Sequence, residues 1–297
     1  MSDIPAYYEK DFGCILSTAI NKYIYITVNE RLENFWRIKY SRTENVDTVG
    51  EIKHRIIRAC LEYMEIKEPL EITAVSEVPS KTGLGSSSAF TVGLLHALHR
   101  YTGEYSSPVQ LAEEACHIEI DTLKEPIGKQ DQYAAALGGT NAIYFAKGNI
   151  SIKPIHLPKA IRDDLSMYYL GRRPASRHIH EDIAVHMEKK RPAIDVVRNV
   201  AVGLYNDLIE GMSPECFGAW LNMAWHTKKQ VSSEIDSPAI ADAVRLAISH
   251  GATGCKLLGE GGSGFLLVYG LDTPITELKH MPIEFEVAGS YVVYDGD

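Results

Sequence analysis

The chain has 297 residues, of which 45% are hydrophobic and 23% charged, as expected for a globular protein with one large or two ordinary domains. Its net charge of −9 argues against a general nucleic-acid or membrane-surface binder, but it is compatible with a local basic pocket. The five scattered cysteines fit reduced thiols better than disulfides or a zinc site, and we find no signal peptide and no apolar run that could cross a membrane. We therefore expect a cytoplasmic protein.

The first half of the chain is predicted to contain strands followed by helices. Alternating polarity predicts a pair of strands at 13–20 and 23–28, joined by the polar Asn21 and Lys22. Helical periodicity recurs from residue 51 onward, and Ser107 and Pro108 are typical of a helix start. The remaining predicted elements of this half are strands at 35–40, 70–76 and 141–145, and helices at 51–64, 88–100 and from 108 to about 119.

The pattern changes near residue 155, where Lys147, Gly148 and two prolines interrupt it, so we place a domain boundary there. The predicted domains are 1–155 and 156–297. The order of strands first and helices later favours an α+β fold over a repeating βαβ sheet. The predicted elements of the second half are strands at 166–170, 264–269 and 284–294, and helices at about 175–190, 192–210, 214–231 and 238–250.

The stretch from Pro79 to Ala89 joins a predicted strand to a predicted buried helix through two glycines and three serines. This arrangement brings free N–H groups and the positive end of a helix dipole together, which favours an anion. Glycine lets the backbone approach a phosphate, and serine hydroxyls can donate to phosphate oxygens or ligate Mg²⁺. A Walker A loop is excluded because no lysine follows the glycines, and Ser88 replaces the third glycine of a dinucleotide-binding loop. The alternative is a serine-capped helix after a glycine turn.

The pattern Pro-x3-Gly-Leu-Gly-Ser-Ser-x-Ala resembles the ATP-binding motif of the superfamily named for galactokinase, homoserine kinase, mevalonate kinase and phosphomevalonate kinase, the GHMP kinases. The resemblance implies a two-domain α+β fold, with an N-terminal domain like that of ribosomal protein S5 and a ferredoxin-like C-terminal domain. ATP and substrate would lie in the cleft between the two. The ATP-binding residues that it implies in this loop are Pro79, Gly83, Leu84, Gly85, Ser86, Ser87 and Ser88.

Two carboxylates, Glu119 and Asp131, flank a loop that contains proline and glycine. Phosphoryl transfer to an alcohol benefits from one carboxylate near the attacking hydroxyl and from another that holds Mg²⁺. The residues alone fit equally well an ordinary helix–loop–helix, with Asp131 as an N-cap and Glu119 solvated. The stretch is similar to a galactokinase-type segment in which a Glu precedes a Gly-x-x-Asp-Gln run. That resemblance implies that Asp131 is the catalytic base and that Glu119 and Ser87 hold Mg²⁺.

A third glycine-rich stretch runs from Gly254 to Gly264, just before a predicted strand. Glycines at this density indicate unusual backbone angles or the close approach of another group, although a tight hairpin is an equal alternative. The stretch is similar to the C-terminal GHMP motif, which lies against the ATP loop, and this adds Gly261 and Gly262 to the implied ATP site. Glu260 and Ser263 depart from the family pattern, and we expect Glu260 to point away from the phosphates.

Several further segments resemble the D-glycero-D-manno-heptose 7-phosphate kinase branch of this superfamily, and together they span essentially the whole chain. The resemblance implies ATP-dependent phosphorylation of the anomeric hydroxyl to give the 1,7-bisphosphate, for nucleotide-activated heptose and surface glycans. The implied partners are a phosphosugar and ATP, with Asp3 and Gly139 on the substrate. Family members carry an N-terminal strand before Asp3, which this sequence lacks, and we expect a misplaced start.

Arg172, Arg173 and Arg177 follow a predicted strand end. A phosphorylated substrate needs such cations, so Arg173 is a candidate phosphate ligand, with surface ion pairs as the equal alternative. His178 and His180 do not share a helix face, which disfavours a metal site. Lys228 and Lys229 are predicted to form a solvated helix face. The functional alternatives are another sugar 1-kinase, of the fucokinase or galactokinase type, and a catalytically silent sugar and ATP sensor.

Overall fold

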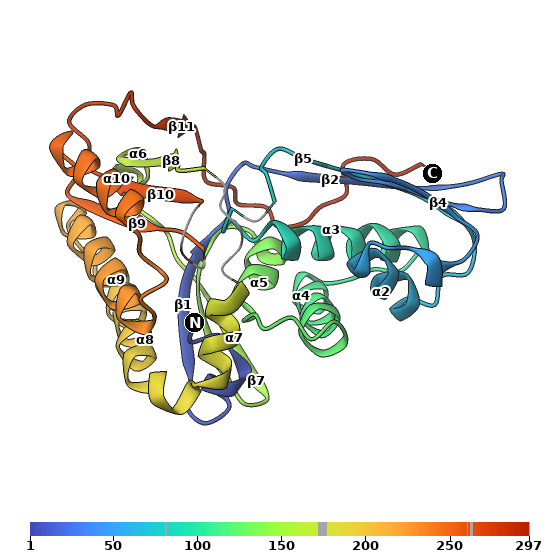
Figure 1. Ribbon diagram of the computed structural model, residues 1–297, viewed down its shortest axis with the longest axis horizontal. Coiled ribbons are helices and arrows are strands. Elements are labelled where there is room, and N and C mark those ends of the chain that lie inside the picture. The colour runs from blue at the N-terminus through green and yellow to red at the C-terminus, as the bar shows by residue number, and fades with distance from the viewer. Residues whose placement is uncertain (81, 172–176, 260, 262–263, 297) are drawn as a thin grey trace.

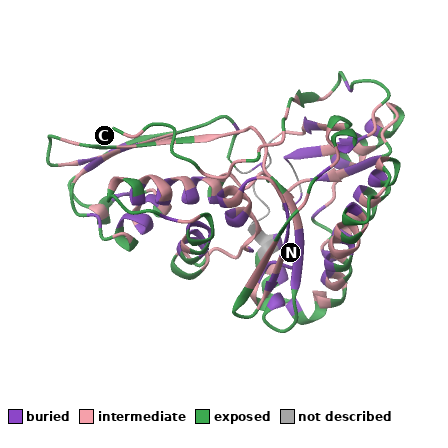
Figure 2. Cartoon of the chain, turned by 180° about the vertical axis from the view of Figure 1, so that it is seen from behind, coloured by how far each residue is buried: buried purple, intermediate pink, exposed green. Residues whose placement is uncertain are grey.

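The structure is a computed structural model, and it describes residues 1–80, 82–171, 177–259, 261 and 264–296. The described residues form three sheets with helices packed against them (Figure 1). Buried residues concentrate where helices meet sheets, and exposed residues lie on the outer surfaces and loop tips (Figure 2). This is the α+β architecture that the order of the predicted elements indicated.

The first sheet has the strand order β2-β5-β3-β4. Strands β3 and β5 are parallel, and the other neighbours are antiparallel. Helices α2 and α3 cover one face, where Ile72 and Leu94 belong to the main hydrophobic core (Figure 1). On the opposite face the Lys39 ammonium lies 2.5 Å from the Glu71 carboxylate. The elements of this layer are β2 (Ile24–Glu30), β3 (Trp36–Lys39), β4 (Thr43–Val46), the 3-10 turn η1 (Val49–Glu51), α2 (Arg55–Tyr63), β5 (Leu70–Ser76) and α3 (Ser86–Tyr101).

The second sheet is antiparallel, in the order β1-β6-β7, with the tight turn at Lys147 and Gly148 joining its last two strands. Helix α5 packs against this sheet through Tyr133, which meets Phe145 edge-on. Helix α4 continues into one π-helical turn, η2. The elements of this layer are α1 (Pro5–Tyr8), β1 (Gly13–Thr18), α4 (Pro108–Cys116), η2 (His117–Thr122), α5 (Gln130–Leu137), β6 (Thr140–Ala146) and β7 (Asn149–Pro154).

The predicted pairing of the strands at 13–20 and 23–28 is wrong. Strand β1 pairs with β6, and β2 pairs with β5 in a different sheet. The backbone N–H of Ala19 donates to the carbonyl of Gly139, and that of Asn21 donates to the carbonyl of Glu284. Because the connecting residues are bonded to other segments, the chain passes from one sheet to the next instead of turning back on itself.

The third sheet lies in the second half, in the order β11-β8-β10-β9, and it is antiparallel throughout. Its Leu266 and Val268 pack against Ala247 of α10. Strand β9 lies at the edge of this sheet, next to α9. The elements of this half are α6 (Lys159–Asp163), β8 (Leu165–Tyr169), α7 (Arg177–Val185), α8 (Met187–Ile209), the 3-10 turn η3 (Pro214–Cys216), α9 (Phe217–Val231), α10 (Pro238–Ser249), β9 (Gly254–Leu257), β10 (Phe265–Tyr269) and β11 (Lys279–Met281).

The strand predicted at 284–294 is wrong, because this segment carries only one isolated bridge, Ile20 to Phe285. Its backbone bonds to two different loops: Gly139 donates to the Glu286 carbonyl, and the Glu286 N–H donates to Ala19. Such divided pairing cannot form a ladder. The segment crosses from the second half back over α3 of the first half (Figure 1), with Ser290 bonded to His96.

The predicted boundary at residue 155 falls in the connection between β7 and α6. The hydrophobic core crosses this point, because Ile183 and Trp225 belong to the same cluster as Leu94. The C-terminal segment crosses it as well. The division into domains 1–155 and 156–297 therefore stays a prediction.

Candidate active site

The glycine-rich loop ends at Gly85, which is the N-cap of the 16-residue helix α3. Gly83 and Gly85 have φ of +78° and +66°, a left-handed backbone that favours glycine. No side chain caps α3 among the described residues, so the alternative of a serine-capped helix is wrong. The first-turn N–H groups and the positive end of the helix dipole are available to an anion at this loop.

The third glycine-rich stretch packs directly on this loop. A Cβ atom on Gly259 would lie 2.2 Å from the Cα of Gly83, and one on Gly264 would lie 2.3 Å from the Thr82 carbonyl oxygen. Only glycine permits backbones to approach this closely. Gly261 is buried against Ile235. A Cβ added to Gly261 would lie 2.7 Å from the Cα of Ile235. Glu260, Gly262 and Ser263 lie outside the described residues, and their predicted roles stay predictions.

Asp131 lies against the same loop, in the first turn of α5. A Cβ on Gly85 would be 3.0 Å from its carboxyl carbon and 3.3 Å from Oδ2. The alternative in which Asp131 is an N-cap is wrong, because the cap of α5 is Lys129 and the helix has no side-chain cap bond. The fold thus brings a partly exposed carboxylate to the N-terminus of α3.

Glu119 is only 1% exposed and lies in the π-helical turn η2. The Ser87 hydroxyl donates to its Oε1 at 2.9 Å, and Gln132 Nε2 donates to its Oε2 at 2.6 Å. Burial raises the pKa of Glu119, and the hydrogen bonds from Ser88, Ser87 and Gln132 oppose this rise without cancelling it. The alternative of a solvated Glu119 is therefore wrong. A hydroxyl and a carboxylate are oxygen donors of the kind that Mg²⁺ prefers, so the pair fits this ion.

Asp3 is 1% exposed and lies beside the start of α5. The Gln130 N–H donates to its Oδ2 at 3.1 Å, and a Cβ on Gly128 would lie 1.9 Å from the same oxygen. Burial alone would raise the pKa of Asp3, but the Met1 ammonium and the Gln130 amide hold it below its usual value. Asp3 thus lies next to the segment that carries Asp131, and its contact with substrate stays a prediction.

Of the other two predicted substrate residues, only Gly139 is described, and it is not brought to Asp131. Gly139 lies beyond the opposite end of α5, and its N–H and carbonyl bond to the Glu286 carbonyl and the Ala19 N–H. Arg172 and Arg173 lie outside the described residues, as does the side chain of Arg177. Their roles stay predictions.

Two residues near the site were missed or misread from the sequence. Gln132 is fully buried and holds Glu119, but a single glutamine after the Asp gave no signal of this role. Lys228 is 9% exposed, so its prediction as part of a solvated face is wrong. Its ammonium donates to the carbonyls of Leu257 and Gly259. Trp225, one helical turn earlier, is buried, and its place in the sequence could have indicated that Lys228 lies on the buried face of α9.

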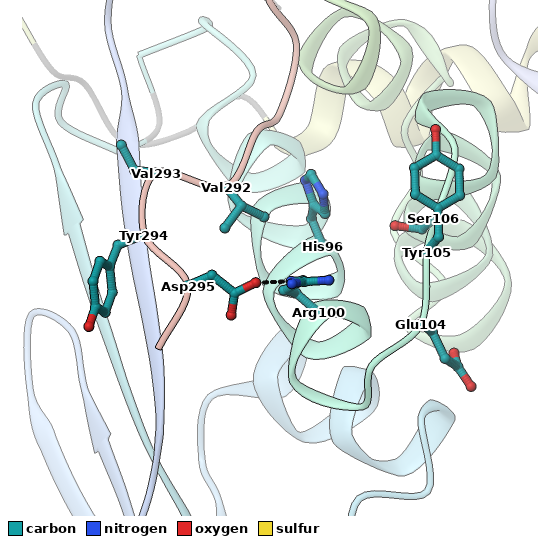
Figure 3. A pocket seen from close by; sticks show the side chains of 9 residues that line it. All are labelled: His96, Arg100, Glu104, Tyr105, Ser106, Val292, Val293, Tyr294 and Asp295. Carbon is teal, nitrogen blue, oxygen red and sulfur yellow. Dashed lines mark hydrogen bonds and ion pairs between the residues drawn. The ribbon is translucent and has the colours of Figure 1, made fainter. Parts of the chain in front are cut away.

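A separate pocket lies between the second half of α3 and residues 292–295. Figure 3 shows Arg100 paired with Asp295 there, beside His96, Tyr105 and Ser106. The glycine-rich loop is at the other end of α3, so this pocket is not part of the candidate active site.

The comparison with known families matches residues 51–139 to the GHMP kinases N terminal domain, and this range contains the loop, Glu119 and Asp131. Residues 51–139 therefore form a GHMP kinase N-terminal domain. The kinase homologues show that the chain is an ATP-dependent phosphotransferase. Its α+β architecture is that of GHMP kinase structures.

Two curated relatives are similar to this chain along most of its length. The D-glycero-alpha-D-manno-heptose 7-phosphate kinase of Campylobacter jejuni is 26% identical over 90% of this chain and 84% of its own. A mevalonate kinase of Methanothermobacter thermautotrophicus is 27% identical over 92% of this chain and 91% of its own. A solved structure described as a D-glycero-D-manno-heptose 1-phosphate kinase from Bacteriodes thetaiotaomicron superposes with a TM-score of 0.77. It covers 99% of this chain and 95% of its own at 22% identity, which shows a shared fold.

In the part of the chain that the structure describes, none of the helices is both long and apolar enough to span a membrane. Within the same residues no group of three or more His, Cys, Asp or Glu side chains is arranged for a metal.

Proposed function

We propose that this kinase phosphorylates the anomeric hydroxyl of D-glycero-D-manno-heptose 7-phosphate to give the 1,7-bisphosphate. The observation that carries the kinase site is the contact between Asp131 and the glycine-rich loop, with 3.0 Å between its carboxyl carbon and a Cβ built on Gly85. A carboxylate at this position faces both a phosphate bound at the α3 N-terminus and an alcohol in front of it.

Each residue of the site has a separate role in this proposal. The loop from Gly83 to Ser88 binds the ATP phosphates through backbone N–H groups. Asp131 accepts the proton of the sugar hydroxyl as that oxygen bonds to the terminal phosphorus of ATP. The bond from this phosphorus to the β,γ-bridging oxygen breaks, and ADP leaves. Ser87 and Glu119 would hold Mg²⁺, which neutralises charge on the phosphates when bound. The buried Gln132 keeps one Glu119 oxygen occupied, so that the other stays on Ser87.

The choice of a heptose phosphate rests on the sequence and on one relative. The Campylobacter enzyme of that name aligns with 90% of this chain. A sugar phosphate is repelled by the overall charge of −9, so its site needs local cations. Arg173, with Arg172 and Arg177, is our candidate for that site.

The test is a comparison of acceptors with ATP in a coupled ADP-release assay. Heptose 7-phosphate, galactose, fucose and mevalonate are offered separately, and the product is identified by phosphorus NMR. We expect kcat/KM for heptose 7-phosphate to exceed that of every other acceptor by at least about 100-fold, equivalent to roughly 2.7 kcal/mol. Preference for another acceptor would overturn the substrate assignment. ATP binding without turnover of any acceptor would favour a silent sensor.

A further inference from the structure

The side chain of Lys228, near the C-terminal end of α9, is buried in the protein interior. Lys228 is 9% exposed, and its ammonium donates to the carbonyl of Leu257 at 3.3 Å and to that of Gly259. Lysine is rarely buried unless its charge is compensated, because an ammonium loses its hydration on burial. The neighbouring Lys229 is more exposed and pairs with Asp236 at 3.4 Å. Two bonds of the Lys228 ammonium are therefore to backbone carbonyls of one short segment.

The two carbonyls belong to the segment that carries the nucleotide loop. Gly259 has φ +72°, and a Cβ on it would lie 2.2 Å from the Cα of Gly83. In the reverse direction, a Cβ on Gly83 would lie 2.6 Å from the Cα of Gly259. A continuous series of contacts thus runs from α9 to the phosphate loop through Lys228, Gly259 and Gly83. A shift of Gly259 must therefore displace Gly83.

Helix α9 also holds the start of the same segment. The Cys255 N–H donates to Asn222 Oδ1 at 3.0 Å, and Asn222 Nδ2 donates to the Thr253 carbonyl at 2.8 Å. Cys255 lies in the edge strand β9, and Thr253 directly precedes it. Helix α9 therefore bonds backbone groups at an edge of the sheet where no further strand pairs. Asn222 fixes the beginning of β9, and Lys228 fixes its end and the glycine turn that follows.

We propose that Lys228 is a positioning residue for ATP: it holds Gly259 against Gly83 and keeps the phosphate loop in its binding conformation. This inference rests on the ATP site of the proposed function, but it does not depend on the identity of the sugar. Lysine suits the position because one ammonium can bond several carbonyls around a turn. The residue acts on the nucleotide through the backbone that it holds.

The experiment measures binding of a non-hydrolysable ATP analogue by calorimetry at about 20 °C, without sugar. Lys228→Met removes the donors and keeps the apolar stem, and Lys229→Met is the matched control on the same turn. We expect the Kd to rise at least tenfold for Lys228→Met and less than twofold for Lys229→Met. Lys228→Arg, which keeps the charge and the donors, should restore part of the affinity. An unchanged Kd in Lys228→Met, with only a lower melting temperature, would overturn the proposal.

A double-mutant cycle tests whether Lys228 acts on Gly83 through Gly259. With Lys228→Arg, the cycle can be measured even if Lys228→Met does not fold. Gly259→Ala forces Gly83 away, so it should raise the Kd for the analogue to a similar extent. When Gly259→Ala is combined with Lys228→Arg or with Lys228→Met, the Kd of the double variant should rise much less than the product of the two single fold-changes. Effects that multiply would show independent roles and overturn the proposal. A wild-type protein that binds no nucleotide would overturn it too, whereas binding without sugar turnover would count against the proposed function alone.

Discussion

At the scale of single residues, the proposed chemistry depends on Asp131. Asp131→Asn keeps the shape of the side chain but removes its ability to accept a proton. We expect kcat to fall by roughly 10²–10⁴-fold, the usual contribution of a general base, while the affinity for ATP changes little. The control is Asp121→Asn, since Asp121 is exposed and pairs with His117 on the surface of η2. Near-normal turnover in Asp131→Asn would remove this residue from the mechanism.

Glu119 couples the metal site to stability. Glu119 is the proposed Mg²⁺ ligand, and its burial raises its pKa above the usual 4.5. Above that pH the folded state therefore retains a proton that the unfolded chain has released. The free energy of unfolding should therefore fall as the pH rises through this window. Glu119→Gln carries no titrating group there. Among the described residues Gln132 Oε1 has no hydrogen-bond partner, so the Gln132 amide can turn over to accept a bond from the new amide.

We therefore expect the stability of Glu119→Gln relative to wild type to improve as the pH rises above 4.5, in the absence of nucleotide and divalent metal. Urea unfolding at a series of pH values measures this difference. Parallel pH profiles for the two proteins would show that Glu119 titrates normally.

Arg173 carries the prediction on substrate choice. A guanidinium grips a phosphate with two parallel donors, which a neutral side chain cannot replace. Arg173→Ala should raise the KM for the phosphosugar by one to two orders of magnitude, about 1.4–3 kcal/mol, and leave the KM for ATP nearly unchanged. Steady-state kinetics with each substrate varied in turn decide this. Equal effects on both constants would make Arg173 structural and favour an unphosphorylated sugar.

At the scale of elements, the loop between β5 and α3 requires glycine for two reasons. Gly85 has φ +66°, and an added Cβ would lie 3.0 Å from the Asp131 carboxyl carbon. Gly85→Ala should therefore weaken ATP binding, displace Asp131 and lose roughly 1–2 kcal/mol of stability to the left-handed backbone.

The matched control is Gly148→Ala in the turn between β6 and β7. Gly148 has a similar φ of +70°, but nothing lies within 4 Å of an added Cβ. Both variants should lose similar stability in chemical unfolding, and only Gly85→Ala should lose ATP affinity and turnover. If both variants bind ATP equally well, the loop is a turn without a nucleotide.

At the scale of the whole molecule, the C-terminal segment holds the two halves together. Gly289 packs so closely on α5 that an added Cβ would lie 1.9 Å from the Ala136 carbonyl oxygen. Gly289→Ala should lower the free energy of unfolding by about 1–3 kcal/mol, the usual cost of overpacking. Gly296→Ala is the control, with no atom within 4 Å of its added Cβ. A Gly289→Ala variant as stable as this control would mean that the segment detaches easily.

The sequence by itself determined the elements that depend on short-range patterns. The strand predicted at 70–76 coincides with β5, and the helices predicted at 88–100 and 238–250 match α3 and α10 within two residues. Periodicity and glycine content are local properties, so they also located the loop at Gly83 and Gly85. The motif resemblance singled out Glu119 and Asp131, and the fold brings both to this loop.

Only the tertiary structure decided which segments meet. The wrong pairing of β1 with β2, the wrong C-terminal strand and the misread Lys228 share one cause. The partner of β1 is more than a hundred positions away, and that of β2 is 40 to 52 positions away. The burial of Lys228 depends on carbonyls of a turn outside its own helix. A local pattern carries no information about these contacts, because the free energy that selects them comes from burial and hydrogen bonding in the assembled fold.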